Sequence, residues 1–145
     1  MTVVEILFFL VVVFIFIQTV NKSSTSPSSS STNPSSNMAG KVVEVKSKAE
    51  FENLIKANAR VIVDFSATWC GPCKAIAPIF AKLSEAHGNI KFVKVDVDEV
   101  AEVAREYNVT AMPTFLFIKD GSVVGEPLRG ANPSALGAQV AQFAA

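Results

Sequence analysis

Two cysteines separated by two residues are the part of this sequence best suited to chemistry. Cys70 and Cys73 are the only cysteines among the 145 residues. A dithiol with this spacing forms a small-loop disulfide that can open and close while the surrounding domain stays folded. A strand-like segment precedes the pair and a helical pattern follows it, so Cys70 is expected at a helix amino terminus, where the dipole stabilises a thiolate. The spacing predicts thiol–disulfide exchange, with Cys73 placed to resolve a mixed disulfide.

A Cys-x-x-Cys pair has two other common readings, half of a structural zinc site and a pair of inert core cysteines. A structural zinc site needs four ligands, whereas this chain offers two cysteines and one histidine. The flanking Trp69, Gly71 and Pro72 disfavour two cysteines that serve only as core packing. Both alternatives stay open at this point, but the redox interpretation is favoured.

Asp64 is the second residue that could take part in chemistry. It interrupts the apolar run from Val61 to Phe65, which has the pattern of a strand buried on both faces. Burial of a carboxylate is costly unless it is paired or protonated, so we expect burial to raise the pKa of Asp64. An acid of this kind, six residues before Cys70, is a candidate proton acceptor. The alternative is an aspartate on the exposed face of a strand.

Hydrophobic periodicity predicts the elements that position these residues. Strands are expected at 42–45, 61–65, 90–97, 114–118 and 123–128, the last two joined by the turn Asp120-Gly121. Helices are expected after the capping box Ser47-x-x-Glu50, after Cys73, at 100–107 and after Asn132-Pro133. The order βαβαβαββα predicts an α/β domain in which a mixed sheet carries helices on both faces.

Three prolines or glycines refine this pattern. Pro78 lies inside the helix that follows Cys73 and is expected to kink it, and the segment 87–89 is expected to end that helix. Pro127 lacks an N–H group and therefore fits only an edge strand.

The first forty residues differ in composition from the remainder. Residues 3–20 are almost wholly apolar with a single charge, Glu5, and at helical rise they span about 27 Å, close to the hydrocarbon core of a bilayer. We expect residues 1–20 to be a membrane anchor or an uncleaved signal, a cleaved signal peptide being the alternative. Residues 21–40 are rich in Ser, Thr, Pro and Asn and are expected to form a disordered tether. Met38 offers an alternative start that would yield a soluble, cytoplasmic form.

Charge excludes one large class of partners. The formal net charge is zero, from 13 basic and 13 acidic side chains, and all of them except Glu5 and Lys22 are mixed along the segment 41–145. Nucleic-acid binding proteins carry a basic stripe or patch, so no nucleic-acid partner is expected.

The segment from 41 to 145 resembles thioredoxin. The pieces that carry this resemblance, in chain order, are Val63-Asp64-Phe65, Ala67-Thr68-Trp69-Cys70-Gly71-Pro72-Cys73-Lys74, Pro78, Lys94-Val95-Asp96, Ala111-Met112-Pro113-Thr114-Phe115, Asp120-Gly121 and Gly130-Ala131-Asn132. The resemblance implies a thioredoxin fold for 41–145 and a protein-disulfide reductase that acts as an electron carrier in cell redox homeostasis.

The resemblance also implies a role for individual residues. Cys70 would be the nucleophile and Cys73 the resolving thiol, with Gly71 and Pro72 between them in the combination typical of reducing members. Asp64 would accept a proton for Cys73 through water, and Lys94 would tune Asp64. Pro113 would follow a cis peptide bond. The substrate surface would be lined by Trp69, Gly71, Pro72, Ala111, Met112, Pro113 and Gly130.

The resemblance also implies the redox partners, whereas the membrane and the location are inferred from the first forty residues. No bound cofactor is expected, because the redox-active Cys70–Cys73 disulfide would receive electrons from NADPH through a thioredoxin reductase. The other partners would be disulfide-containing client proteins and, through residues 3–20, a membrane; we expect a monomer. Lys22 follows the apolar run, so the domain is expected to face the cytosol. The alternatives are an oxidant or isomerase of the secretory pathway and a partner-binding module that needs no redox chemistry.

Two departures from the family pattern lie near the end of the chain. The segment Gly125 to Arg129 is one residue longer than the usual edge strand, so a bulge is expected near Gly125. Arg129 stands where a small apolar residue is common, which bears on the choice of partner.

Overall fold

Strands and helices alternate as far as β4, three strands then follow one another, and a helix ends the order within residues 41–145, the part of the chain that this computed structural model describes. The elements are β1 (Val43–Val45), α2 (Lys48–Ala57), β2 (Arg60–Ser66), α3 (Gly71–Ala86), β3 (Lys91–Asp96), α4 (Ala101–Glu106), β4 (Thr114–Lys119), β5 (Ser122–Val123), β6 (Leu128–Arg129) and α5 (Pro133–Ala144). The predicted anchor and tether lie outside the described residues. Within 41–145, no helix is both long and apolar enough to cross a bilayer.

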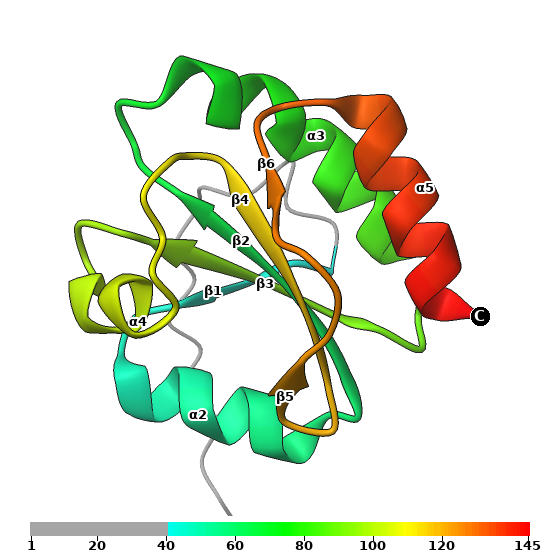
Figure 1. Ribbon diagram of the computed structural model, residues 1–145, viewed down its shortest axis with the longest axis horizontal. Coiled ribbons are helices and arrows are strands. Elements are labelled where there is room, and N and C mark those ends of the chain that lie inside the picture. Colours follow the sequence, from blue (N-terminus) through cyan, green and yellow to red (C-terminus); the bar gives the residue numbers. More distant parts are fainter. Residues whose placement is uncertain (1–40) are drawn as a thin grey trace, which may run out of the picture. The chain divides into compact units, whose positions relative to one another are not determined.

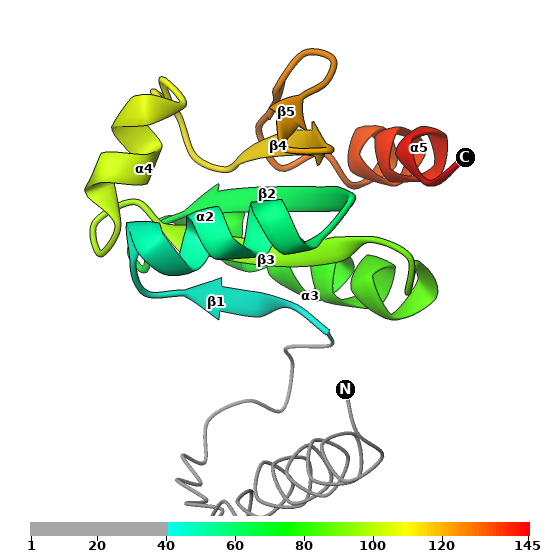
Figure 2. The same cartoon turned by 90° about the horizontal axis from the view of Figure 1, so that it is seen from below.

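The strands form one mixed sheet in the order β1-β3-β2-β4-β5, and β6 also pairs with β4. Strands β1, β3 and β2 are parallel, whereas β4 runs antiparallel to β2. Helices α3 and α5 pack on one face of the sheet and α2 and α4 on the other, as Figures 1 and 2 show. The predicted fold class, a mixed sheet with helices on both faces, is confirmed.

Each face of the sheet has its own hydrophobic core. Along β2, Val61, Val63 and Phe65 point to the α2 and α4 side, and Ile62 points to the α3 and α5 side. This follows from the period of two in a strand, which places alternate side chains on opposite faces. All four side chains are fully buried, which explains why β2 reads as a continuous apolar run.

Local capping groups fix where the helices begin. Ser47 Oγ accepts a hydrogen bond from the Glu50 N–H at 3.2 Å, and a Glu50 carboxylate oxygen accepts from the Lys46 N–H at 2.9 Å. The predicted capping box is therefore present, with its return bond one residue before the cap. Asn132 caps α5 through its side-chain oxygen, which accepts from the Ala135 N–H at 3.1 Å. Helix α3 ends at Ala86 with His87 as its cap, as expected.

The predicted strand at 123–128 is wrong in one respect. The chain forms two strands of two residues, β5 and β6, which both pair with β4, and the residues between them are not in the ladder. Gly125 adopts a φ of +71°, a left-handed conformation that is incompatible with an extended strand. Pro127 has no N–H to donate and lies in this interruption, not in an edge strand. The single-residue bulge expected near Gly125 is thus a longer break.

Candidate active site

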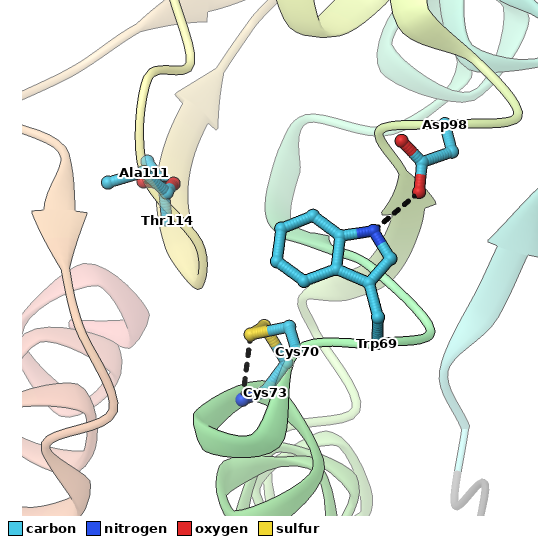
Figure 3. Close-up of a disulfide and its surroundings, with 6 residues drawn as sticks. All are labelled: Trp69, Cys70, Cys73, Asp98, Ala111 and Thr114. Carbon is cyan, nitrogen blue, oxygen red and sulfur yellow. Dashed lines mark hydrogen bonds between the residues drawn. A yellow bond between two sulfur atoms is a disulfide. The ribbon is translucent and has the colours of Figure 1, made fainter.

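The two cysteines form a disulfide at the amino end of α3. Cys70 is the N-cap of this 16-residue helix, and its Cα lies 5.3 Å from that of Cys73 across the S–S bond. The Cys73 N–H donates to Cys70 Sγ at 3.2 Å, as Figure 3 shows. Pro72 occupies the first turn, where its missing N–H costs no helical bond. The expected position of Cys70 at a helix amino terminus is confirmed, and the helix dipole there favours a thiolate once the disulfide opens.

A second loop lies opposite the disulfide and presents the Met112–Pro113 peptide bond. That bond is cis, as the resemblance implied. Met112 packs against the small cluster formed by Ala67, Cys70 and Cys73. Two hydrogen bonds hold the loop in place: Thr114 Oγ1 donates to the Ala111 carbonyl at 2.7 Å, and the Gly130 N–H donates to the Pro113 carbonyl at 2.8 Å. Figure 3 shows Ala111 and Thr114 on this loop, across the site from the disulfide.

Trp69 has a hydrogen-bond partner that sequence reasoning missed. Its indole Nε1 donates to Asp98 Oδ2 at 2.8 Å, and the Asp98 N–H in turn donates to Asp96 Oδ1 at 2.9 Å. The Trp69 side chain is nevertheless 66% exposed, so the bond orients an aromatic surface beside Cys70 without burying it. No pattern in the sequence connects two residues 29 positions apart, and only the fold brings them together.

Asp64 is buried, as expected, and the alternative of an aspartate on an exposed strand face is excluded. The residue is 2% exposed, and no hydrogen bond within the described part of the chain reaches its Oδ1. Desolvation raises the pKa of Asp64 to about 7, while the positive charge of Lys94 acts in the opposite direction. The predicted upward shift and the predicted influence of Lys94 both agree with this environment.

The face of β2 that carries Asp64 is the face covered by α3. Ile62 lies on that face and packs with Ile76 and Phe80 of α3. Asp64 and Ser66 follow at intervals of two residues, so their side chains point to the same side, toward the helix that begins with the cysteines. Ser66 Oγ is also buried without a hydrogen-bond partner in the described residues. The carboxyl end of β2 therefore places two unsatisfied oxygens beneath the first turns of α3.

The remaining predicted site residues gather around the disulfide with different exposure. Trp69, Gly71, Pro72 and Ala111 are exposed, Met112 and Gly130 are half-buried, and Pro113 is buried. Gly130 has a φ of +90°, which side chains rarely adopt. These residues come from the loop before α3, the loop before β4 and the residue after β6, three segments that the sheet brings to one end.

Comparison with known proteins identifies relatives of this domain. The family model described as Thioredoxin matches residues 42–142. Thioredoxin-3, mitochondrial, of Saccharomyces cerevisiae is 50% identical over 66% of this chain and 74% of its own length. Thioredoxin 1 of Plasmodium falciparum is 52% identical over 70% of this chain and 96% of its own. The match to Thioredoxin-2 of Pyricularia oryzae is 58% identical but spans 53% of that protein.

Solved structures agree with these sequence matches. A structure of Plasmodium falciparum thioredoxin superposes with a TM-score of 0.68 at 50% identity, over 70% of this chain and 98% of that one. The thioredoxin NaTrxh of Nicotiana alata superposes with a TM-score of 0.71 at 37% identity, over 75% of this chain and 97% of that one.

Proposed function

The chain belongs to the thioredoxin family and is a thiol–disulfide oxidoreductase, and we propose that it reduces protein disulfides with electrons from NADPH delivered by a thioredoxin reductase. The observation that carries this proposal is the Cys70–Cys73 disulfide at the amino end of α3. The Gly-Pro pair between the cysteines supports the reducing direction, since it is the combination that the resemblance associates with reductases.

Disulfide exchange would proceed in two steps. The Cys70 thiolate attacks one sulfur of a client disulfide, which forms a mixed disulfide and releases the other client sulfur as a thiolate. The Cys73 thiolate then attacks Cys70 Sγ, which closes the Cys70–Cys73 disulfide and releases the second client thiolate. The client gains two electrons, and two protons complete its thiols. The reductase returns two electrons to the pair.

Asp64 would accept the proton that Cys73 loses before the second step. The Asp64 side chain points toward α3, which begins with the cysteines. Its pKa of about 7 lets the carboxyl group take up and release a proton near physiological pH. Lys94 would tune this equilibrium, because its charge favours the ionised carboxylate. A water molecule between Asp64 and Cys73 would carry the proton, and the unsatisfied Asp64 Oδ1 is free to accept its hydrogen bond.

Clients would bind on the surface around the disulfide. The exposed Trp69 and the half-buried Met112 provide apolar contact area, and the Met112 backbone is available to pair with an extended client chain. The surface would be shallow because its other members have small side chains or none: Gly71, Pro72, Ala111 and Gly130.

Insulin reduction tests the proposal. The domain of residues 38–145 is expected to reduce insulin with NADPH and a thioredoxin reductase, and Cys70→Ser is expected to lose this activity. Lys82→Gln, an exposed change on α3, is the matched control and should keep it. Turnover with dithiothreitol but not with NADPH and the reductase would contradict the proposed electron donor. The absence of turnover with both donors would contradict the reductase function.

We also propose that residues 1–20 anchor the domain to a membrane on its cytosolic side, through a tether at 21–40. The support is the apolar run at 3–20 and the position of Lys22. The native chain should resist carbonate extraction and be open to protease on intact cytosol-side-out vesicles. A chain that starts at Met38 should be released from the membranes by carbonate. Carbonate release, or endoglycosidase-sensitive mass on the sequon at Asn108, would contradict the anchor or its orientation.

A further inference from the structure

Arg129 lies at the end of the sheet that carries the redox site. It is the second residue of the short strand β6, where antiparallel pairing places it opposite Thr114 of β4. Thr114 is in turn the partner of Phe65, near the carboxyl end of β2, from which the chain leads to Cys70. Figure 1 shows β6 at the end of the sheet where α3 begins. The strand pairing therefore brings Arg129 to the same end of the sheet as the disulfide.

Two contacts place Arg129 beside the loop that contains the cis peptide bond. Residues directly opposite each other in an antiparallel pair carry their side chains on the same face of the sheet, about 4.5–5.5 Å apart at Cβ. On that face, Thr114 Oγ1 donates to the Ala111 carbonyl at 2.7 Å. The residue after Arg129, Gly130, donates its N–H to the Pro113 carbonyl at 2.8 Å. The Arg129 side chain thus emerges next to the loop along which a client chain would pair.

The charge of Arg129 has no neutralising partner among residues 41–145. The side chain is exposed and takes part in none of the ion pairs there. Asp98 accepts the Trp69 indole N–H, and Figure 3 shows that pair on one side of the disulfide and Thr114 on the other. Lys74, in the first turn of α3, is exposed and also outside the ion pairs. The Arg129 side of the site is therefore positively charged.

The acidic residues closest to Arg129 along the chain lie elsewhere. Glu126 is exposed and lines a hollow beside Phe117 and Phe143. Asp120 follows the last residue of β4, whereas Arg129 pairs with the first residue of that strand. Neither carboxylate is thus placed against the guanidinium.

We propose that Arg129 makes the domain select clients that carry an acidic residue beside the reacting cysteine. This inference rests on the proposed reductase function and names the clients of that same site. A guanidinium can hold a carboxylate through two parallel charge-assisted hydrogen bonds, and arginine is enriched at protein interfaces. Arg129 gives up no ion pair within residues 41–145 when it meets such a carboxylate. A basic residue at the same client position would be repelled.

Two disulfide peptides that differ only in the residues beside the cysteine test this selection. One carries glutamate on both sides of the cysteine, the other carries lysine, and neither contains tryptophan. Plasmodium falciparum thioredoxin, matched over 98% of its chain, is a folded domain of this size, so residues 38–145 suffice. The reduced domain is mixed with each peptide, and the fluorescence of Trp69 gives the rate constant. Each rate constant is divided by that of dithiothreitol with the same peptide, which corrects for the reactivity of the peptide itself.

The corrected rate constant should be higher for the glutamate peptide than for the lysine peptide. In Arg129→Gln the ratio of the two should fall about threefold to tenfold, and in Arg129→Glu it should fall below one, because attraction and repulsion change places. Arg129→Lys keeps the charge without the fork and should keep most of the ratio. Misfolding would remove the preference but would not reverse it, so a reversed ratio can come only from the new charge.

The matched control is Lys82→Glu, which makes the same change of charge at an exposed position farther along α3. Its ratio should stay within about twofold of the wild type. Raising the salt from about 0.01 M to about 1 M should lower the wild-type ratio, since the Debye length falls from about 30 Å to about 3 Å.

The outcomes separate this inference from the reductase function. A domain that reduces both peptides with a ratio that Arg129→Glu leaves unchanged, or that Arg129→Glu and Lys82→Glu alter equally, would overturn the role of Arg129 and leave the reductase function standing. A wild-type domain that reduces neither peptide would overturn both.

Discussion

Asp64 and Lys94 occupy the same register position on the neighbouring parallel strands β2 and β3. The carboxyl group is almost fully buried, whereas Lys94 is half-buried. Burial raises the pKa of Asp64 and the neighbouring cation limits that rise, so the net value of about 7 reflects two opposing effects. Because desolvation is the larger of the two effects, the ionised form of Asp64 lowers the stability of the folded domain.

Replacing Asp64 by Asn should make the stability of the domain less dependent on pH. Between the ordinary pKa of 3.8 and about 7, the unfolded chain has lost a proton that the folded chain retains. The free energy of unfolding of the wild type therefore falls as pH rises through this window. Above pH 7 the variant should be more stable by roughly 4 kcal/mol, and at pH 3 the difference should vanish. Urea unfolding from pH 3 to 8 measures this.

The exposed Asp120→Asn is the control for that experiment, and its curve should run parallel to the wild type. An Asp64→Asn curve that also runs parallel would contradict the raised pKa.

The same substitution should change the pH dependence of disulfide exchange. Asp64 can accept a proton only when it is ionised, so the rate of the wild type should rise as pH passes about 7. In Asp64→Asn this rise should disappear and the rate at pH 8 should fall on the order of 10²-fold. Trp69 is the only tryptophan of the chain and lies beside Cys70, so its fluorescence reports the reaction in stopped flow. An unchanged rate profile would exclude Asp64 as the acceptor.

Loss of the Asp98 carboxylate should affect client binding more than folding. Asp98→Ala removes the acceptor of the Trp69 indole N–H, and because Trp69 is mostly exposed, water can replace that bond. We expect a KM for insulin that is about twofold to tenfold higher, with kcat nearly unchanged and less than about 1 kcal/mol of stability lost. Glu85→Ala, an exposed acid on α3, is the matched control. A lower kcat with an unchanged KM would contradict this positioning role.

Two glycines should respond in opposite ways to alanine. Gly130 has a φ of +90° and donates its N–H to the Pro113 carbonyl, whereas Gly137 lies within α5; an added Cβ would touch nothing within 4 Å at either. Gly130→Ala should therefore lose about 1 kcal/mol or more through backbone strain alone and weaken client binding. Gly137→Ala should gain about 0.5–1 kcal/mol from helix propensity. Thermal unfolding of both variants decides the matter.

Much of the fold could be predicted because local patterns and tertiary packing agree here. The run around Asp64 reads as a strand buried on both faces, since α2 and α4 cover one side and α3 and α5 the other. Helix starts could be placed from Ser47 and Asn132, because an N-cap needs a side-chain acceptor at one defined position. Strand ends shifted by a residue or two, since pairing partners and not propensity determine them.

The missed features depend on contacts between distant segments or on backbone conformation. The left-handed Gly125 and the break it introduces between β5 and β6 leave little trace in hydrophobic periodicity. The bond from Trp69 to Asp98 joins loops that only the sheet brings together.

The break between β5 and β6 has a consequence for self-association. A long, straight edge strand is a template on which another chain can add, and this is a common route to aggregation. The β4 side of this sheet is covered by two strands of two residues, with Gly125 and Pro127 between them. The opposite edge, β1, has three residues. Within residues 41–145, neither edge offers a ladder long enough for a second copy to extend, so this sheet is a poor template for strand addition.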